Sequence, residues 1–276
     1  MIFQRLIWSA LAAAVLVGSV QSGVQRWQAV PIILAAEVYE GQKVEAPVAP
    51  VANTAHAHAE GVSAEHTHDH SAAAEEWSPA EGAERIFWTW VANVLHAFSM
   101  ALLVFAVMGV CLWRGTMMSS LPLALLVAAA GWLTFHFWPS LGLHAETPGN
   151  DAARLGLRQG WWLLAVASAA LACTSLATLR KPLGFVLAAI LLAVPFVIGA
   201  PHITTDPLAG FSAPAQLALR DLGDQFIWAT TWVSLSFWIS MGVVSGVAFQ
   251  RWLRPVLQVV FEGAKSSATT TPAVSQ

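Results

Sequence analysis

The chain has 276 residues, of which 57% are apolar and only 11% carry a charge. Soluble domains carry about 25% charged residues, so this composition is typical of an integral membrane protein and excludes a soluble enzyme or a disordered regulator. Thirteen basic against sixteen acidic residues give a net charge of −3, which also excludes a nucleic-acid-binding protein. The two cysteines, Cys111 and Cys173, lie in apolar runs and form no metal-binding CxxC motif.

Six stretches of the sequence are long and apolar enough to cross a bilayer, which takes about 20 apolar residues. They run over Leu6–Gln25, Ile86–Trp113, Thr116–Ser140, Gln159–Leu179, Pro182–Ala200 and Phe226–Phe249. We therefore expect an all-α, polytopic membrane protein. Residues 1–36 would form the first transmembrane helix with a Pro-containing extension, and residues 81–255 a five-helix transmembrane region. The first span also resembles a signal peptide, so its cleavage is an alternative.

The distribution of basic residues predicts the orientation of the spans. One side of the membrane receives basic residues only in short loops and chain ends: Arg5, Arg114, Arg180, Lys181, Arg251, Arg254 and Lys265. Such a side normally faces the cytoplasm, so both termini are expected inside, with residues 256–276 as a disordered cytoplasmic tail. Every acidic residue except Glu262 falls on the other side, where it would attract cations.

A His- and Glu-rich segment, residues 37–80, is expected to be a flexible external loop. It holds five of the nine histidines within about fifteen residues. Imidazoles beside carboxylates suit cobalt, nickel, copper or zinc. The alternative is a low-complexity loop that only solvates the surface. We favour metal capture, with the ligands His56, His58, His66, His68, Asp69 and His70.

A second group of polar residues follows Pro and Gly at the outer ends of the third and fifth spans. It consists of His144 and Glu146 after the third span and His202 after the fifth. Interrupted helices at corresponding positions form ion sites in transporters, so these residues are candidates for a metal pathway. The alternative is that Pro and Gly merely end the helices.

Within the second span, Asn93 and His96 lie about one turn apart. Polar residues in a lipid-spanning helix must face protein or water, so both are candidates for the same pathway. Hydrogen bonding between helices explains Asn93 equally well.

Several catalytic motifs are absent from the sequence. It has no phosphate-binding GxxxxGK[ST] loop, no HExxH, no GxSxG and no dinucleotide-binding glycine pattern. We therefore expect no nucleotide, no resident cofactor and no enzymatic activity.

The order and spacing of several short motifs resemble the CbtA family of probable cobalt transporter subunits, over roughly residues 1–255. These motifs are Val30–Glu40, Trp77–Gly82, Ala92–Leu95, Leu141–Leu143 with Glu146–Gly149, Arg158–Trp162 and Ile198–Pro201. The resemblance implies a bacterial inner-membrane protein that works in cobalt supply for cobalamin synthesis with a small, single-span, His-bearing partner, CbtB. Where the family usually has Pro-Pro-Glu, this chain has His144-Ala145-Glu146.

Together these observations predict a subunit for uptake of cobalt, or of another divalent metal such as nickel or zinc. The metal would bind the external histidines, move to His144, Glu146 and His202, and then pass His96. One alternative is a metal-binding accessory or assembly protein without transport of its own. Another is a haem oxidoreductase using His96 and His136 as axial ligands, which we disfavour because these histidines are expected at different depths.

Overall fold

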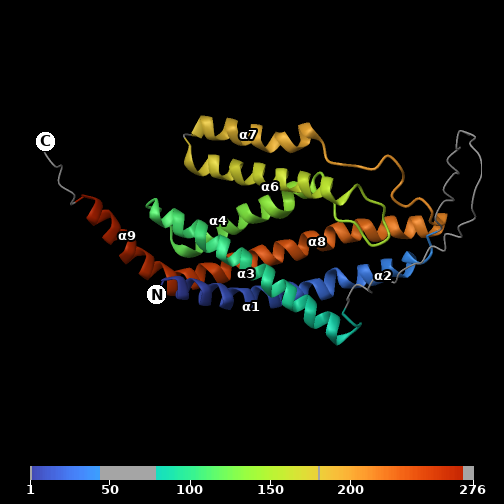
Figure 1. The fold of residues 1–276 in the computed structure, drawn as a ribbon, viewed down its shortest axis with the longest axis horizontal. Helices are drawn as coiled ribbons and strands as arrows, with labels where there is room; N and C mark the ends of the chain where they lie inside the picture. The colour runs from blue at the N-terminus through green and yellow to red at the C-terminus, as the bar shows by residue number, and fades with distance from the viewer. Residues whose placement is uncertain (1, 44–78, 180, 270–276) are drawn as a thin grey trace, which may run out of the picture.

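The computed structural model describes residues 2–43, 79–179 and 181–269, and in these residues it contains helices and no strand (Figure 1). The helices are α1 (Ile2–Gln28), α2 (Val30–Glu40), α3 (Ala83–Trp113), α4 (Ser120–Trp132), α5 (Trp138–Ser140), α6 (Leu155–Thr178), α7 (Lys181–Ile198), α8 (Ala213–Ala248) and α9 (Arg254–Thr269). Two π-helical turns, η1 (Leu133–Phe137) and η2 (Phe249–Leu253), join α4 to α5 and α8 to α9.

Six helical segments in this part of the chain are long and apolar enough to span a membrane. They are Ile2–Gln28, Ala83–Trp113, Ser120–Ser140, Leu155–Thr178, Lys181–Ile198 and Ala213–Ala264. Each contains most of one span expected from the sequence. The prediction of an all-α, six-span membrane protein is therefore confirmed.

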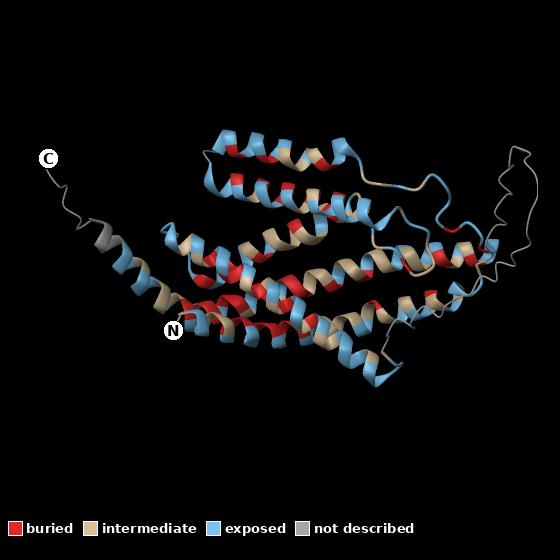
Figure 2. Cartoon of the chain, in the orientation of Figure 1, coloured by how far each residue is buried: buried red, intermediate tan, exposed pale blue. Residues whose placement is uncertain are grey.

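The bundle has a core of four helices and a peripheral hairpin. Helix α1 packs along both α3 and α8, and α4 packs along α8. Helices α6 and α7 pack mainly against each other, with α6 also touching η1 and α5. Buried residues concentrate where α1, α3, α4 and α8 meet, whereas α7 is largely exposed and apolar (Figure 2). An exposed apolar helix is suited to contact with lipid.

Small residues let the core helices approach closely. On α1 these are the buried residues Ser9, Ala10, Ala13, Ala14 and Gly18. A Cβ atom added to Gly18 would lie 2.8 Å from the Cα atom of Val94 on α3. Because lipid tails are as apolar as the side chains, such close packing is a main source of helix association in membranes. Since α1 supplies part of the core, its removal as a signal peptide would expose the packed faces of α3 and α8.

Both π-helical turns precede a proline. Pro139 and Pro255 each lie two residues beyond the end of their turn. Proline cannot donate a backbone hydrogen bond, and its ring clashes with the carbonyl group four residues earlier. A wider turn before the proline relieves that clash at the cost of a local distortion. The turn η1 carries His136, so this distortion falls at a histidine inside a membrane span.

Helix α8 extends past the hydrocarbon region at one end. Its 36 residues correspond to about 54 Å, against about 30 Å of hydrocarbon. Its first turns pack against α2 through an apolar cluster made of Ala36, Leu208, Phe211, Ala215 and Leu219. We call this the outer end of the bundle, following the orientation expected from the basic residues.

Two expected boundaries are wrong. Residues 37–40 do not belong to a loop, because Ala36 packs in the outer cluster and Glu37 pairs with Arg85, which keeps α2 helical to Glu40. Residues 256–269 are not disordered, because Leu257 packs on the core and the Phe261 ring meets Trp113 edge-on at 5.0 Å, within α9. The remaining parts of the expected loop and tail, 44–78 and 270–276, lie outside the described residues.

We predict that Gly18→Ala destabilises the protein by about 1–3 kcal/mol, because the new methyl group would overlap the backbone of α3. Gly23→Ala is the matched control, since a Cβ atom there meets nothing within 4 Å on the same helix. Thermal unfolding of the purified protein in detergent measures both. Equal melting temperatures for the two variants would contradict the close α1–α3 approach.

Candidate functional site: a cavity between the membrane helices

A cavity of about 640 Å³ lies between α1, α2, α3, α6, α8 and the π turn η1. Its lining includes many side chains that could bind a metal ion or hydrogen-bond to its water ligands: Gln21, Gln25, Thr89, His96, Met100, His136, Thr230 and Ser234. On α3 the lining runs from Arg85 to Met100, a rise of about 22 Å along the helix. The cavity therefore reaches from the outer end of the bundle well into the membrane span.

Two histidines from different helices share this cavity. His96 comes from α3, and its ring lies 5.1 Å from that of Phe237 on α8. His136 comes from η1, with its ring 6.2 Å from Trp132. From the sequence these histidines were expected at different depths, but in the structure they lie beside adjacent residues of α8, because His96 contacts Phe237 while Phe135, next to His136, stacks on Trp238 at 6.0 Å.

Two buried polar atoms at the cavity have no hydrogen-bond partner in the described protein. They are Nε2 of His136 and Oε1 of Gln21. An unpaired polar atom in a protein interior is costly and calls for a specific explanation, such as a bound ion or water. Both atoms carry a lone pair that could be donated to a cation, so the cavity can serve as a metal site.

Asn93 is buried and does not line the cavity itself. Its side-chain amide is buried and donates to the hydroxyl of Ser22 at 2.9 Å and to Oε1 of Gln25 at 2.6 Å, both on α1. Gln25 itself lines the cavity. Asn93 and His96, which share a face in the sequence analysis, thus have different roles: Asn93 joins α3 to α1 and orients Gln25, and His96 lines the cavity.

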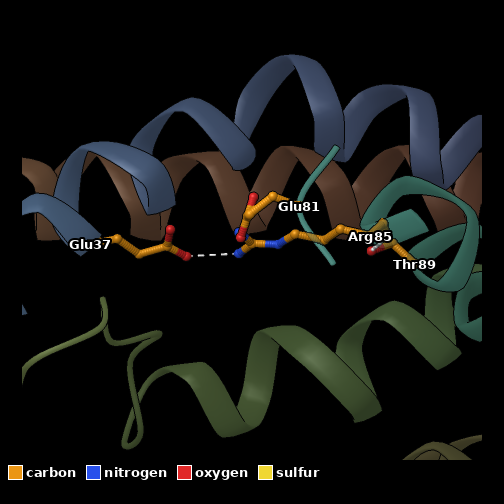
Figure 3. Close-up of polar contacts among 4 residues, drawn as sticks. All are labelled: Glu37, Glu81, Arg85 and Thr89. Carbon is orange, nitrogen blue, oxygen red and sulfur yellow. Dashed lines mark hydrogen bonds and ion pairs between the residues drawn. The ribbon is translucent and has the colours of Figure 1, made fainter. Parts of the chain in front are cut away.

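At the outer rim of the cavity, one arginine side chain, Arg85, is paired with two carboxylates. The guanidinium group of Arg85 donates to Oε1 of Glu37 at 2.7 Å and to Oε1 of Glu81 at 2.9 Å (Figure 3). Glu37 comes from α2 and Glu81 from the segment before α3, so this network also ties the two helices together. With two negative charges around one positive charge, the rim does not repel an approaching cation.

A second pocket, of about 490 Å³, is lined by His144, Glu146 and Arg158. Glu146 forms an ion pair with Arg158 at 2.7 Å. Ile33 and Phe226 line both this pocket and the larger cavity, so the two spaces are neighbours. His202 is exposed and is not in the lining of either space. In the part of the chain that the structure describes, no three His, Cys, Asp or Glu side chains are close enough to hold a metal together.

The histidine-rich segment lies outside the described residues, and with it His56, His58, His66, His68, Asp69 and His70. The described residue nearest to it on the α2 side is Lys43. The ammonium group of Lys43 pairs with Asp151 at 2.6 Å and contacts the carbonyl oxygen of Gly149 at 3.5 Å. Gly149 also lines the His144 pocket, so Lys43, the last described residue before the segment, lies beside that pocket.

Gln21, Gln25 and Met100 were not predicted as site residues from the sequence, and His136 was considered only as a haem ligand paired with His96, in an alternative that was disfavoured. Gln21 and Gln25 carry a signal that could have identified them, because two amides four residues apart share one face of an otherwise apolar helix. Met100 carries no such signal, since methionine is an ordinary apolar residue in a membrane span. His136 could be assigned to the cavity only once the contacts of both helices with α8 were known.

The fold and the cavity define a multi-pass membrane protein with a polar space inside its helix bundle. The family model for CbtA, described as probable cobalt transporter subunit, matches residues 3–250. The chain therefore belongs to the CbtA family. Comparisons with curated proteins and with solved structures found no match.

We predict that Asn93→Ala lowers the stability of the protein by about 1 kcal/mol, because it removes two interhelical hydrogen bonds. Ser99→Ala on the same helix is the control, since the Ser99 hydroxyl bonds only to the carbonyl oxygen of Leu95 within α3. The measurement is thermal unfolding in detergent. An unchanged melting temperature for Asn93→Ala would show that the amide does not join the helices.

Proposed function

We propose that this chain is the membrane subunit of a cobalt uptake transporter in which His96 and His136 contact the metal inside the bundle. The observation that carries the proposal is the cavity that brings these two histidines together from different helices. The family of the chain supports cobalt as the transported metal. Nickel and zinc share the preference for imidazole and are the competing substrates.

The proposed route begins at the external histidines, His56 to His70, and leads to the pocket of His144 and Glu146. From there the metal enters the adjoining cavity and reaches His96 and His136. Two features support this order: Lys43, the last described residue before the histidine-rich segment, is held beside the pocket, and the pocket shares two lining residues with the cavity. His202, being exposed and outside both linings, contributes at most to the outer surface of this route.

The chemistry of the cavity suits transient binding. Imidazole nitrogens, amide oxygens and a thioether are neutral ligands, and in this lining they come from His96, His136, Gln21, Gln25 and Met100. A dication that keeps its full charge is held less tightly than one neutralised by carboxylates. Conduction needs such a compromise, because an ion must bind well enough to enter and weakly enough to leave.

In this proposal the chain lies in the bacterial inner membrane with both termini in the cytoplasm and acts with a small, single-span partner of the CbtB type. The absence of nucleotide-binding motifs in the sequence is consistent with an ion gradient, the membrane potential or the partner as the driving force. No reaction is catalysed and no cofactor is required. An accessory protein that only binds metal would leave cobalt flux into liposomes at background.

Because His96 and His136 line one cavity, their expected depths no longer argue against haem with these two histidines as its axial ligands. The family of the chain favours cobalt over haem as the occupant. An absorption spectrum of the purified protein separates the two, because bound haem gives an intense Soret band and bound Co²⁺ does not.

Replacing the five external histidines, His56, His58, His66, His68 and His70, by Ala is predicted to slow cobalt uptake several-fold at limiting cobalt but not at saturating cobalt. A capture segment raises the local metal concentration without taking part in passage through the bundle. Uptake of radioactive cobalt into cells, measured over a range of concentrations, gives both values. Uptake unchanged at limiting cobalt would remove the capture step.

His96→Gln and His136→Gln are each predicted to lower the maximal rate of cobalt uptake by about tenfold or more, since loss of a group that supports a bound metal typically has such an effect. Unlike the external substitutions, they act at saturating cobalt. Ser99→Ala is the control on α3, and surface expression normalises the rates. A maximal rate equal to that of the control would exclude the cavity from the pathway.

A further inference from the structure

A pocket at the opposite end of the bundle from the acidic rim is lined by two arginines. Its volume is about 480 Å³, and it lies where the start of α4 meets the end of α8 and η2. Arg251 and Arg254 supply two positive charges, and Ser119, Ser120 and Gln250 supply polar groups. This is the end that the basic residues assign to the cytoplasm.

These arginines differ from four basic residues of the outer end, Lys43, Arg85, Arg158 and Arg220, because they pair with no carboxylate among the described residues. The ion pairs among the described residues are Lys43–Asp151, Arg85–Glu37, Arg85–Glu81, Arg158–Glu146 and Arg220–Asp206, all at the outer end. Arg254 instead donates to the neutral oxygens of Ser120 and Gln250, each at 3.3 Å. Glu262 lines a neighbouring pocket together with Arg254 but forms no ion pair with it in the described structure.

The surroundings of the arginines indicate what kind of anion would fit. Leu121 and Val247, which also line the pocket, are 43% and 57% exposed, so an apolar surface adjoins the charged groups. A free anion gains no binding energy from an apolar surface, whereas a lipid places its phosphate at the membrane surface and its acyl chains beside apolar helices. Guanidinium groups match phosphate oxygens in geometry and charge, and basic pockets between membrane helices on the cytoplasmic side bind anionic headgroups.

We propose that this pocket binds the phosphodiester headgroup of an anionic phospholipid through Arg251 and Arg254. The lipid would join α4 to the α8–η2 junction from the cytoplasmic leaflet. Its binding is independent of the metal route, which lies at the other end of the bundle. The start of α4 adds to the attraction, because its N-cap residue Ser119 makes no side-chain capping hydrogen bond and Ser119, Ser120 and Leu121 line the pocket.

Native mass spectrometry of the full chain in detergent, with phosphatidylglycerol or phosphatidylcholine added in equal amounts, tests the proposal. We expect the wild-type protein to retain phosphatidylglycerol preferentially. Arg251→Gln with Arg254→Gln should weaken that binding by about tenfold, because charge-assisted hydrogen bonds are lost. Lys181→Gln removes one charge from the same end, on α7, and should leave the binding unchanged.

Arg251→Gln alone keeps the test valid if the double variant fails to fold, because the Arg251 side chain is exposed and makes no hydrogen bond or ion pair with any described residue. It should lower phosphatidylglycerol binding on its own. Equal retention of both lipids, or binding by the arginine variants equal to that of Lys181→Gln, would overturn the proposal. Displacement of the lipid by millimolar inorganic phosphate would reassign the pocket to free phosphate and overturn the lipid as its ligand.

Discussion

A polar group within the hydrocarbon of a membrane must find its partner inside the protein, and this requirement shapes the whole bundle. Asn93 meets it by bonding to Ser22 and Gln25 across the α1–α3 contact. His136 and Gln21 meet it only in part, since one polar atom of each has no partner in the described protein. Both face a single cavity, where a bound ion or water would satisfy them.

The two ends of the bundle satisfy their charges in different ways. At the outer end, four basic side chains pair with carboxylates, and at the rim of the cavity Arg85 pairs with two of them. At the other end, Arg251 and Arg254 have none among the described residues and line a pocket beside apolar surface. The result is an outer end at which a cation is not repelled and an inner end that attracts anions.

The apolar composition of the sequence predicted the membrane spans, but it did not predict helix boundaries and site residues that depend on contacts between helices. The six spans follow from the lengths of the apolar runs, and the structure has all six. The extension of α2 to Glu40 depends on the pairing of Glu37 with Arg85, and that of α9 depends on contacts of Leu257 and Phe261, all of which join residues distant in the chain. The pair His96 and His136 was disfavoured from the sequence because of their expected depths, and only the contacts of both helices with α8, His96 with Phe237 and Phe135 with Trp238, reveal that they line one cavity.

In the proposed mechanism, Co²⁺ binds inside the bundle at His96 and His136, separately from the external histidines. The most direct measurement is cobalt binding to the purified chain after the five external histidines have been replaced by Ala, with X-ray absorption at the cobalt edge. The account predicts one remaining Co²⁺ with imidazole ligands, lost when His96 and His136 are also changed to Gln. A chain that retains no cobalt after the external substitutions would contradict the claim.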